Sequence, residues 1–214
     1  MIFQDNVIKE YLKNVYFITG TPCGGKTTIS RALAKRYGLM VYDVDEQFSK
    51  HQKISNKNWQ PAMNKTFKGA DEFFDRTIEE YSQWLLDNTR EQLDFVIMDL
   101  ICISQSQKVI CDLHLTIDEA SVLTESERIV FLIKEPSNIV DEYCNRKDHD
   151  VFKLFINSAS NPIKAKATCN ATLERINKKR YCQIKESDYF WLERNFGSTV
   201  EETMLTVAKH FGLE

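Results

Sequence analysis

The sequence has no long apolar stretch. Its 214 residues are 43% hydrophobic and 28% charged, yet no run approaches the roughly 20 apolar residues that a membrane-spanning helix needs. The first six residues, Met1 to Asn6, lack the basic start and apolar core of a secretory signal. We therefore expect a single globular domain over residues 1–214, located in the cytoplasm and with no membrane partner.

Cysteine pairs and extremes of charge are also missing. The six cysteines form no C-x-x-C pair, which argues against a zinc knuckle and a thiol redox motif. The net charge of -3 indicates neither a general polyanion binder nor an acidic tail. The N-K-x-D element of guanine-specific GTPases is absent as well, which disfavours that class.

Glycine is scarce, and its distribution is informative. Three of the seven glycines fall within residues 20–28, which read Gly-Thr-Pro-Cys-Gly-Gly-Lys-Thr-Thr. This segment matches the phosphate-loop pattern G-x-x-x-x-G-K-[ST], which a chain of this length would contain by chance about one time in a hundred. An apolar run precedes it at 15–18, and a helical pattern closed by a glycine follows at 29–38. The order of strand, glycine loop and helix is the context that a phosphate-binding loop requires.

The residue types in this segment suit the binding of a nucleoside triphosphate. Glycine permits backbone angles that aim successive N–H groups at phosphate oxygens, and the positive end of the following helix adds to the attraction. Lys26 would contact the β- and γ-phosphates, and the Thr27 hydroxyl would bind the Mg²⁺ that bridges them. We expect ATP as the nucleotide, held by Gly20, Thr21, Pro22, Cys23, Gly24, Gly25, Lys26, Thr27 and Thr28.

Five short apolar runs predict buried strands. They cover residues 15–19, 39–42, 95–98, 129–133 and 189–192. Helical patterns fall between them, the clearest over residues 67–89 and another over 199–212. Alternation of this kind predicts an α/β fold with a mostly parallel sheet covered on both faces.

Two carboxylates follow the second predicted strand. Because ligand groups in such sheets gather at one edge, the acids of Asp43-Val44-Asp45 could face the phosphates held after the first strand. In an extended chain Asp43 and Asp45 would point the same way. One could bind Mg²⁺ or accept a proton from the attacking hydroxyl, and the other could hold a substrate hydroxyl. The alternative is that either residue caps the next helix.

A third carboxylate ends the apolar run Phe95 to Met98. Asp99 there has the form of the Walker-B acid, which supports the metal in phosphate-loop proteins. We therefore predict Asp99 as a metal-supporting residue.

Positive charge is concentrated in residues 146–185. This segment contains ten Lys or Arg residues and three Asp or Glu residues, so its net charge is +7. Because the whole chain has a net charge of -3, the rest of the chain carries -10. A solvated helix face explains most of this excess. The alternative is a lid, in which one or two cations close over the polyphosphate and shield it from water.

The order of these parts resembles the nucleoside-monophosphate-kinase-like branch of phosphate-loop kinases, most closely the shikimate-kinase and small-molecule-kinase group. Three features carry the resemblance: residues 20–28, the D-x-D-like Asp43-Val44-Asp45, and the run 129–133 followed by Pro136 and Arg146. The resemblance implies a five-stranded parallel sheet in the order 2-3-1-4-5 flanked by helices. It also implies a substrate-binding helical segment near residues 46–90 and a lid near residues 146–185.

The resemblance extends to individual residues. The acids that serve the metal and the substrate hydroxyl in shikimate kinases fall on Asp43 and Asp45, and Arg76 with Glu79 looks like the R-x-x-E of a substrate-binding helix. Arg76 could equally be a surface partner of Glu72 or Glu80. The triple glycine that shikimate kinases carry after the third strand is absent, since residues 100–104 read Leu-Ile-Cys-Ile-Ser. Shikimate itself is therefore not implied as the acceptor.

Together these features predict a kinase that uses ATP and Mg²⁺ to phosphorylate a hydroxyl or phosphate of a small metabolite. Lys26, Asp43 and Arg146 are the predicted catalytic residues, with Arg146 supplying positive charge from the lid. Two alternatives remain: a regulatory module that binds nucleotide with little turnover, and a kinase that acts on RNA or a nucleic-acid end, which the basic segment suggests.

Overall fold

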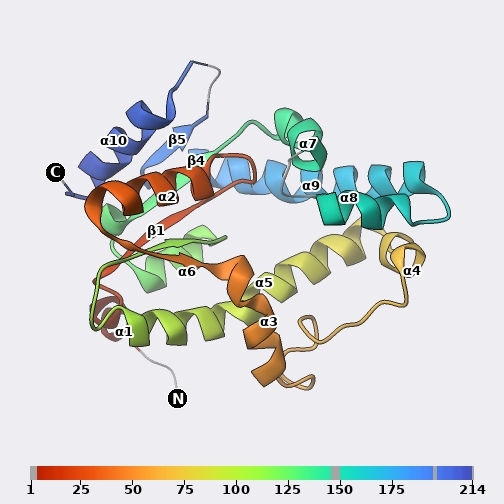
Figure 1. Cartoon of the computed structure of the whole chain (residues 1–214), viewed down its shortest axis with the longest axis horizontal. Coiled ribbons are helices and arrows are strands. Elements are labelled where there is room, and N and C mark those ends of the chain that lie inside the picture. Colours follow the sequence, from red (N-terminus) through yellow and green to blue (C-terminus); the bar gives the residue numbers. More distant parts are fainter. Residues whose placement is uncertain (1–3, 146–149, 195–196, 214) are drawn as a thin grey trace. The chain divides into compact units, whose positions relative to one another are not determined.

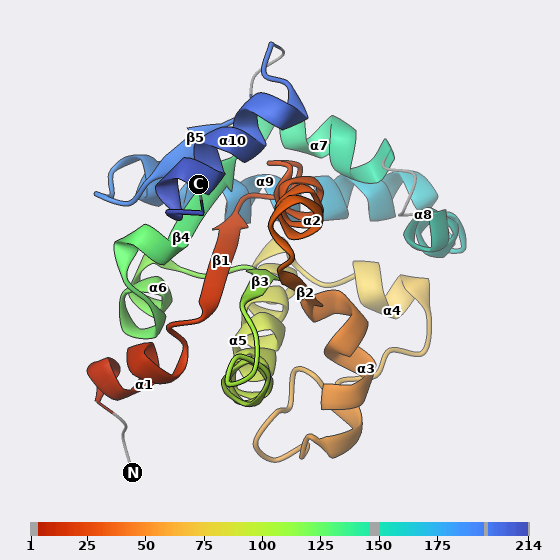
Figure 2. The same ribbon diagram turned by 60° about the vertical axis from the view of Figure 1, so that its left-hand side comes forward.

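A five-stranded parallel sheet organises the fold. The computed structural model describes residues 4–145, 150–194 and 197–213 (Figure 1). Its strands run in the order β2-β3-β1-β4-β5 (Figure 2). The strands are β1 (Val15–Gly20), β2 (Met40–Asp43), β3 (Val109–Asp112), β4 (Ile129–Ile133) and β5 (Trp191–Glu193). The predicted α/β class and the strand order 2-3-1-4-5 are confirmed.

Helices connect the strands. In chain order they are α1 (Asp5–Tyr11), α2 (Lys26–Tyr37), α3 (Val44–Ile54), α4 (Ala70–Phe74), α5 (Ile78–Ile103), α6 (Ile117–Leu123), the 3₁₀ turn η1 (Ser126–Arg128), α7 (Pro136–Asn145), α8 (Asp150–Asn157), α9 (Pro162–Lys185) and α10 (Val200–His210). Within the described ranges, none of them is both long and apolar enough to span a bilayer.

The central strands are buried along their whole length. Every residue of β1 and of β4 is buried, as expected for parallel strands whose two faces are both covered. In the register, Phe17 of β1 pairs with Ile129 of β4, and Ile18 pairs with Asp112 of β3. The carboxyl end of β3 therefore lies directly beside β1 (Figure 2).

The chain divides into two compact units, each built from separate segments. Unit 1 comprises the described residues within 1–47, 95–134 and 180–214 and contains the whole sheet. Its core joins β1 and β4 to α2 and α10. Fully or nearly buried members are Ile18, Leu33, Ile110, Val130, Leu132, Met204 and Val207.

Unit 2 comprises the described residues within 48–94 and 135–179. It is helical, and its core is rich in aromatic side chains. The buried members are Ala70, Phe74, Tyr81, Ile156, Ala159, Ala165, Cys169 and Leu173. The two ranges that form this unit overlap most of the segments in which the sequence predicted substrate binding and a lid.

The predicted strand over residues 95–98 is wrong. These residues lie inside α5, where Val96 and Leu100 are buried and Met98 is 60% exposed, which is a helical rather than an alternating pattern. The third strand of the sheet is instead β3, a run of four residues from Val109 to Asp112.

The predicted helix over 67–89 is interrupted. α4 ends at Phe74 and α5 begins at Ile78. The Thr77 hydroxyl accepts a hydrogen bond from the Glu80 N–H at 3.1 Å, and the Glu80 carboxylate accepts one from the Thr77 N–H at 2.9 Å. This reciprocal capping starts a new helix, so the apolar periodicity continues across a break in the backbone.

Candidate functional site

The phosphate loop lies tightly against the end of β4. Gly20 has φ +127°, and a Cβ atom there would lie 2.0 Å from the Leu132 carbonyl oxygen; at Gly24 the same oxygen would lie 2.3 Å away. The Thr21 N–H donates to this oxygen at 3.1 Å. Only glycine fits at the two positions, because any side chain would displace the loop from the strand.

Thr21 anchors the loop from within. Its side chain is fully buried, and its hydroxyl accepts a hydrogen bond from the Lys134 N–H at 2.7 Å. The hydroxyl of this predicted nucleotide-binding residue therefore serves the fold. Its main chain does so as well, since its N–H donates to the Leu132 carbonyl and its carbonyl accepts a hydrogen bond from Lys26.

The opposite side of the loop is open. Gly25 has φ +94°, no atom lies within 4 Å of the position that a Cβ would occupy there, and α2 begins at the next residue. The Lys26 ammonium group donates to the Thr21 carbonyl at 3.1 Å, so the lysine lies along the loop. The start of a helix attracts anions, so the first turn of the twelve-residue α2, beside Lys26, is a candidate anion-binding site.

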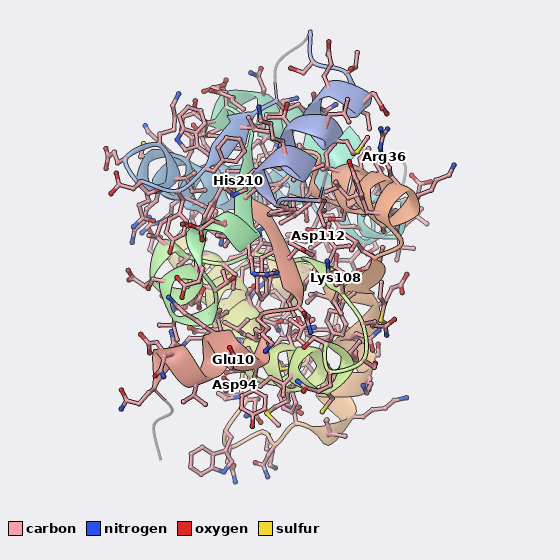
Figure 3. All side chains as sticks on the ribbon, turned by 90° about the vertical axis from the view of Figure 1, so that its left-hand side faces the viewer. Glu10, Arg36, Asp94, Lys108, Asp112 and His210 are labelled. Carbon is pink, nitrogen blue, oxygen red and sulfur yellow. The ribbon has the colours of Figure 1, made fainter. Side chains whose placement is uncertain are left out.

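Thr27 and Asp112 meet beside this site. The Thr27 hydroxyl donates to Asp112 Oδ2 at 2.5 Å, and Asp112 lies at the end of β3 beside β1 (Figure 3). Burial raises the pKa of Asp112, while Lys26 and the Thr27 hydrogen bond oppose that shift. Asp112 thus occupies the position at the carboxyl end of a central strand that the sequence analysis assigned to Asp99. The apolar run Val109 to Cys111 before it was the signal that could have identified it.

Asp99 has a different environment. It lies on α5, and its Oδ2 accepts a hydrogen bond from the Tyr42 hydroxyl at 2.9 Å. Burial, followed by this hydrogen bond, raises the pKa of Tyr42. The prediction that Asp99 ends a Walker-B strand is therefore wrong, because the strand on which it depended is a helix.

Asp43 caps a helix. Its Oδ1 accepts a hydrogen bond from the Asp45 N–H at 3.1 Å, and α3 begins at Val44. The expectation that Asp43 and Asp45 point the same way along an extended chain is wrong, since Asp45 is helical. Asp43 nevertheless pairs in register with Asp112. Both Asp43 and Asp45 raise the pKa of Asp112 by charge repulsion, so the three carboxylates share one electrostatic environment.

A histidine and an arginine that the sequence analysis missed lie next to the loop. His114 Nδ1 is 2.9 Å from Arg180 Nη1 and 3.1 Å from the Gly20 carbonyl oxygen. Burial, then Lys26 and Arg180, lower the pKa of His114 well below its usual range. The Arg180 guanidinium can only donate and the Gly20 carbonyl can only accept, so the tautomer of His114 determines which of the two contacts is a hydrogen bond. No carboxylate of the described residues pairs with Arg180 at ion-pair distance.

Arg76 lies within unit 2, in the break between α4 and α5. Its guanidinium carbon is 4.4 to 4.7 Å from four ring centroids, those of Phe67, Phe73, Tyr81 and Trp84. Its Nε–H donates to the Phe73 carbonyl at 2.8 Å. Nη1 and Nη2 are buried and have no hydrogen-bond partner among the described residues. The alternative prediction, that Arg76 pairs on the surface with Glu72 or Glu80, is therefore wrong.

A cleft of about 260 Å³ adjoins the loop within unit 1. Gly24, Gly25 and Thr28 form one wall. Leu132 and Leu192 contribute apolar surface, and residues at the start of α10 line the remainder. Arg194, at its edge, donates to the Cys23 carbonyl at 2.9 Å. Arg146, a predicted catalytic residue, lies outside the described residues.

The donor set fits Mg²⁺. Over the described ranges, no three His, Cys, Asp or Glu side chains form a ready metal cluster. Mg²⁺ bound with a nucleotide does not need one, since it takes one or two protein oxygens together with phosphates and water. The Thr27 hydroxyl and the Asp112 carboxylate are oxygen donors of the right type.

The chain is similar to several known proteins. A protein of Methanocaldococcus jannaschii named "Putative adenylate kinase" is 33% identical over 85 residues, which are 38% of this chain and 48% of that protein. The match thus spans about half the length of that relative. Among solved structures, TT1252 from Thermus thermophilus has a TM-score of 0.50 at 16% identity, with 94% of this chain and 97% of that chain covered. Shikimate kinase from Aquifex aeolicus has a TM-score of 0.45 at 14% identity, with 92% and 96% covered.

The strand order 2-3-1-4-5 is the one that the resemblance implied. The family model described as AAA domain matches residues 17–190, which is most of the chain. The chain belongs to this AAA domain family.

Proposed function

We propose that this protein transfers the γ-phosphoryl group of ATP, with Mg²⁺, to a hydroxyl or phosphate of a small metabolite. The observation that carries the proposal is the 2.5 Å hydrogen bond between Thr27 and Asp112 beside the loop lysine. It brings together, before any ligand binds, the hydroxyl and the carboxylate that a nucleotide-bound magnesium ion requires.

Donor binding is assigned to the loop and its neighbours. Residues 20–28 would hold the phosphates, mainly through the N–H groups of residues 25–28, because Pro22 has no N–H and the Thr21 N–H donates to the Leu132 carbonyl. Lys26 would exchange its contact with the Thr21 carbonyl for one with the β- and γ-phosphates. When bound, Mg²⁺ would neutralise charge on the phosphates. Thr27 and Asp112 would hold it, and Asp43 remains a candidate for contact through water.

The cation that stabilises the transferring group is the next requirement. Arg146 was predicted for this role from the sequence, and we retain it as a proposal. We add Arg180, because it lies beside the loop and contacts the His114 ring at 2.9 Å rather than a carboxylate. A guanidinium that is not held by a carboxylate near a phosphate site is suited to a phosphate oxygen.

Asp43 and Asp45 of unit 1 and, separately, Arg76 of unit 2 are the proposed acceptor contacts. Asp43 would orient the acceptor hydroxyl or accept its proton, and Asp45 would bind a second hydroxyl. The two buried Nη groups of Arg76 lack partners among the described residues, and this supports a contact with an anionic group of the acceptor. We assign the nucleotide base to the cleft beside Gly24 and Gly25, where Leu132 and Leu192 offer apolar surface.

The test is acceptor-stimulated release of ADP from MgATP across a panel of small metabolites. We expect stimulation by one chemical class, and we expect Lys26→Ala to abolish it while the protein remains folded. Lys35→Ala is the matched control, because Lys35 is exposed on the same helix. Nucleotide binding without stimulation by any class would indicate a regulatory module, and unchanged turnover in Lys26→Ala would refute the mechanism.

The nucleic-acid alternative has less support. Three cations of α9 are already paired: Lys164 with Asp75, Arg175 with Glu79, and Lys185 with Glu193. Part of the basic segment is thus neutralised by neighbouring acids, which favours the solvated-face interpretation. Oligonucleotide binding with a steep salt dependence would reverse this judgement.

A further inference from the structure

The helices of the predicted substrate-binding segment share one apolar core with those of the predicted lid. Phe74 of α4 and Tyr81 of α5 are each 3% exposed, and they pack in one cluster with Ile156 of α8 and Cys169 of α9. The Phe155 ring of α8 has its centroid 5.6 Å from that of Phe74. This core therefore joins side chains that lie about 75 to 95 positions apart in the sequence.

A row of polar contacts follows the same boundary. Asp71, Asp75 and Glu79 are spaced four residues apart, and each meets a residue from the lid side. The Ser160 N–H and hydroxyl donate to the Asp71 carboxylate at 2.7 and 2.6 Å. The Lys164 ammonium lies 2.6 Å from Asp75 Oδ1, and Arg175 pairs with Glu79.

We infer that the substrate-binding segment and the lid of this protein form one conformational body, and that neither opens without the other. The names of the two segments rest on the proposed function, but their union rests on the shared core and the polar row. An element moves independently when few buried apolar contacts hold it to its neighbours. Here α4 and the start of α5 cannot separate from α8 and α9 without exposing Phe74, Tyr81, Ile156 and Cys169.

The consequence for binding is coupling between the two ligands. Arg76 is enclosed by aromatic rings of the same unit that carries the lid helices. Any displacement of the lid by nucleotide would therefore also move the proposed acceptor contact. The free energy of binding one ligand would then depend on whether the other is bound.

Hydrogen exchange of the full-length protein tests this inference without nucleotide or acceptor. We expect Phe74→Ala in α4 to increase amide exchange in α8 and α9 about as much as in α4, by roughly a hundredfold or more. We expect β1 and β4 to retain their protection. Leu86→Ala is the control, because Leu86 is 40% exposed on α5 and its removal should change exchange in α8 and α9 less than about threefold.

Two further variants make the test robust. Phe74→Leu leaves a smaller cavity, so it should produce the same pattern at lower amplitude if Phe74→Ala does not fold. Ile156→Ala in α8 should raise exchange in α4 and residues 78–94 reciprocally. Increased exchange confined to the helix that carries the substitution would overturn the inference. Because no ligand is present, this outcome is independent of whether the protein transfers phosphate.

Discussion

Gly20 must lack a Cβ atom for the loop to pack against β4. A Cβ atom there would lie 2.0 Å from the Leu132 carbonyl oxygen, and the residue has φ +127°. Both the contact and the backbone angle exclude other residue types. The motif thus requires glycine here for packing against β4, in addition to the approach of a phosphate.

We predict that Gly20→Ala lowers the free energy of unfolding by about 3 kcal/mol or more, because neither the strand nor the loop can yield without breaking the sheet. Urea denaturation measures this change. Gly69→Ala is the control, since its backbone is extended and nothing lies within 4 Å of its Cβ position. Its effect should stay within about 1 kcal/mol, and equal losses at both sites would contradict the packing argument.

The guanidinium of Arg180 carries a prediction about affinity. We expect Arg180→Gln to weaken binding of MgATP by roughly tenfold or more, because a charge-assisted hydrogen bond to phosphate is lost. Isothermal titration calorimetry is the measurement. Lys178→Gln removes an exposed charge from the same helix and should leave affinity nearly unchanged. Similar affinities for Arg180→Gln and the wild type would remove Arg180 from the proposed phosphate site.

Among the helices, α10 has a cap that depends on pH. The Thr199 hydroxyl accepts a hydrogen bond from the Glu202 N–H at 3.1 Å, and the Glu202 carboxylate accepts one from the Thr199 N–H at 3.0 Å. The backbone bond first, and the Thr199 hydroxyl second, lower the pKa of Glu202 below 4.5. A depressed carboxyl pKa stabilises the folded state above the ordinary value, and this contribution disappears as pH falls through the folded-state pKa.

We therefore predict that Glu202→Gln lowers the free energy of unfolding at pH 7, and that the difference from wild type shrinks as pH falls below 4.5. Urea denaturation at a series of pH values gives both quantities. Glu201→Gln is the neighbouring control, because Glu201 is not part of the cap and is an exposed partner of Arg36. A difference that does not depend on pH would show that the carboxylate charge is not responsible.

The strands and helices also show where the sequence was informative and where it was misleading. The runs at 15–19 and 129–133 are strands because continuous apolar residues are typical of a buried parallel sheet. The run at 95–98 has the same composition, but it belongs to the 26-residue α5. Short apolar runs do not distinguish a strand from one buried turn of helix. The apolar run of the four-residue β3 is shorter than the run at 95–98, so the strand was not predicted there. Asp112, which ends β3, was missed for the same reason.

The environment of Arg76 was missed for a different reason. The sequence offered it as a substrate ligand or a surface partner, whereas its four ring neighbours include Phe67, which precedes the helix break, and Trp84, which follows it. Such an enclosure depends on how the chain bends at Asp75 to Thr77. That bend results from the capping by Thr77 and Glu80, which the apolar periodicity does not reveal.

For the whole molecule, the kinase resemblance implied the strand order, and the sheet confirms it. The division into two units did not follow from it. Contacts such as those of Phe74 with Phe155 join residues that are distant in the sequence, and no local pattern specifies such pairs.

Ligand binding should stabilise the molecule by mass action. We predict that a non-hydrolysable ATP analogue with Mg²⁺, at about one hundred times its Kd, raises the free energy of unfolding by about 2.7 kcal/mol. Thermal or urea unfolding with and without the analogue gives this value. Lys26→Ala should lose most of the stabilisation at the same concentration, and Lys35→Ala should keep it. Equal stabilisation of both variants would mean that the nucleotide binds away from the loop.

The loop packs against a main-chain atom of β4, the carbonyl oxygen of Leu132. The Leu132 carbonyl accepts the Thr21 N–H at 3.1 Å and limits both Gly20 and Gly24. Every amino acid supplies this carbonyl, so the contact with the loop does not select the side chain at position 132, which the buried core constrains instead. The partner that holds the loop in place would thus leave no trace in a sequence motif.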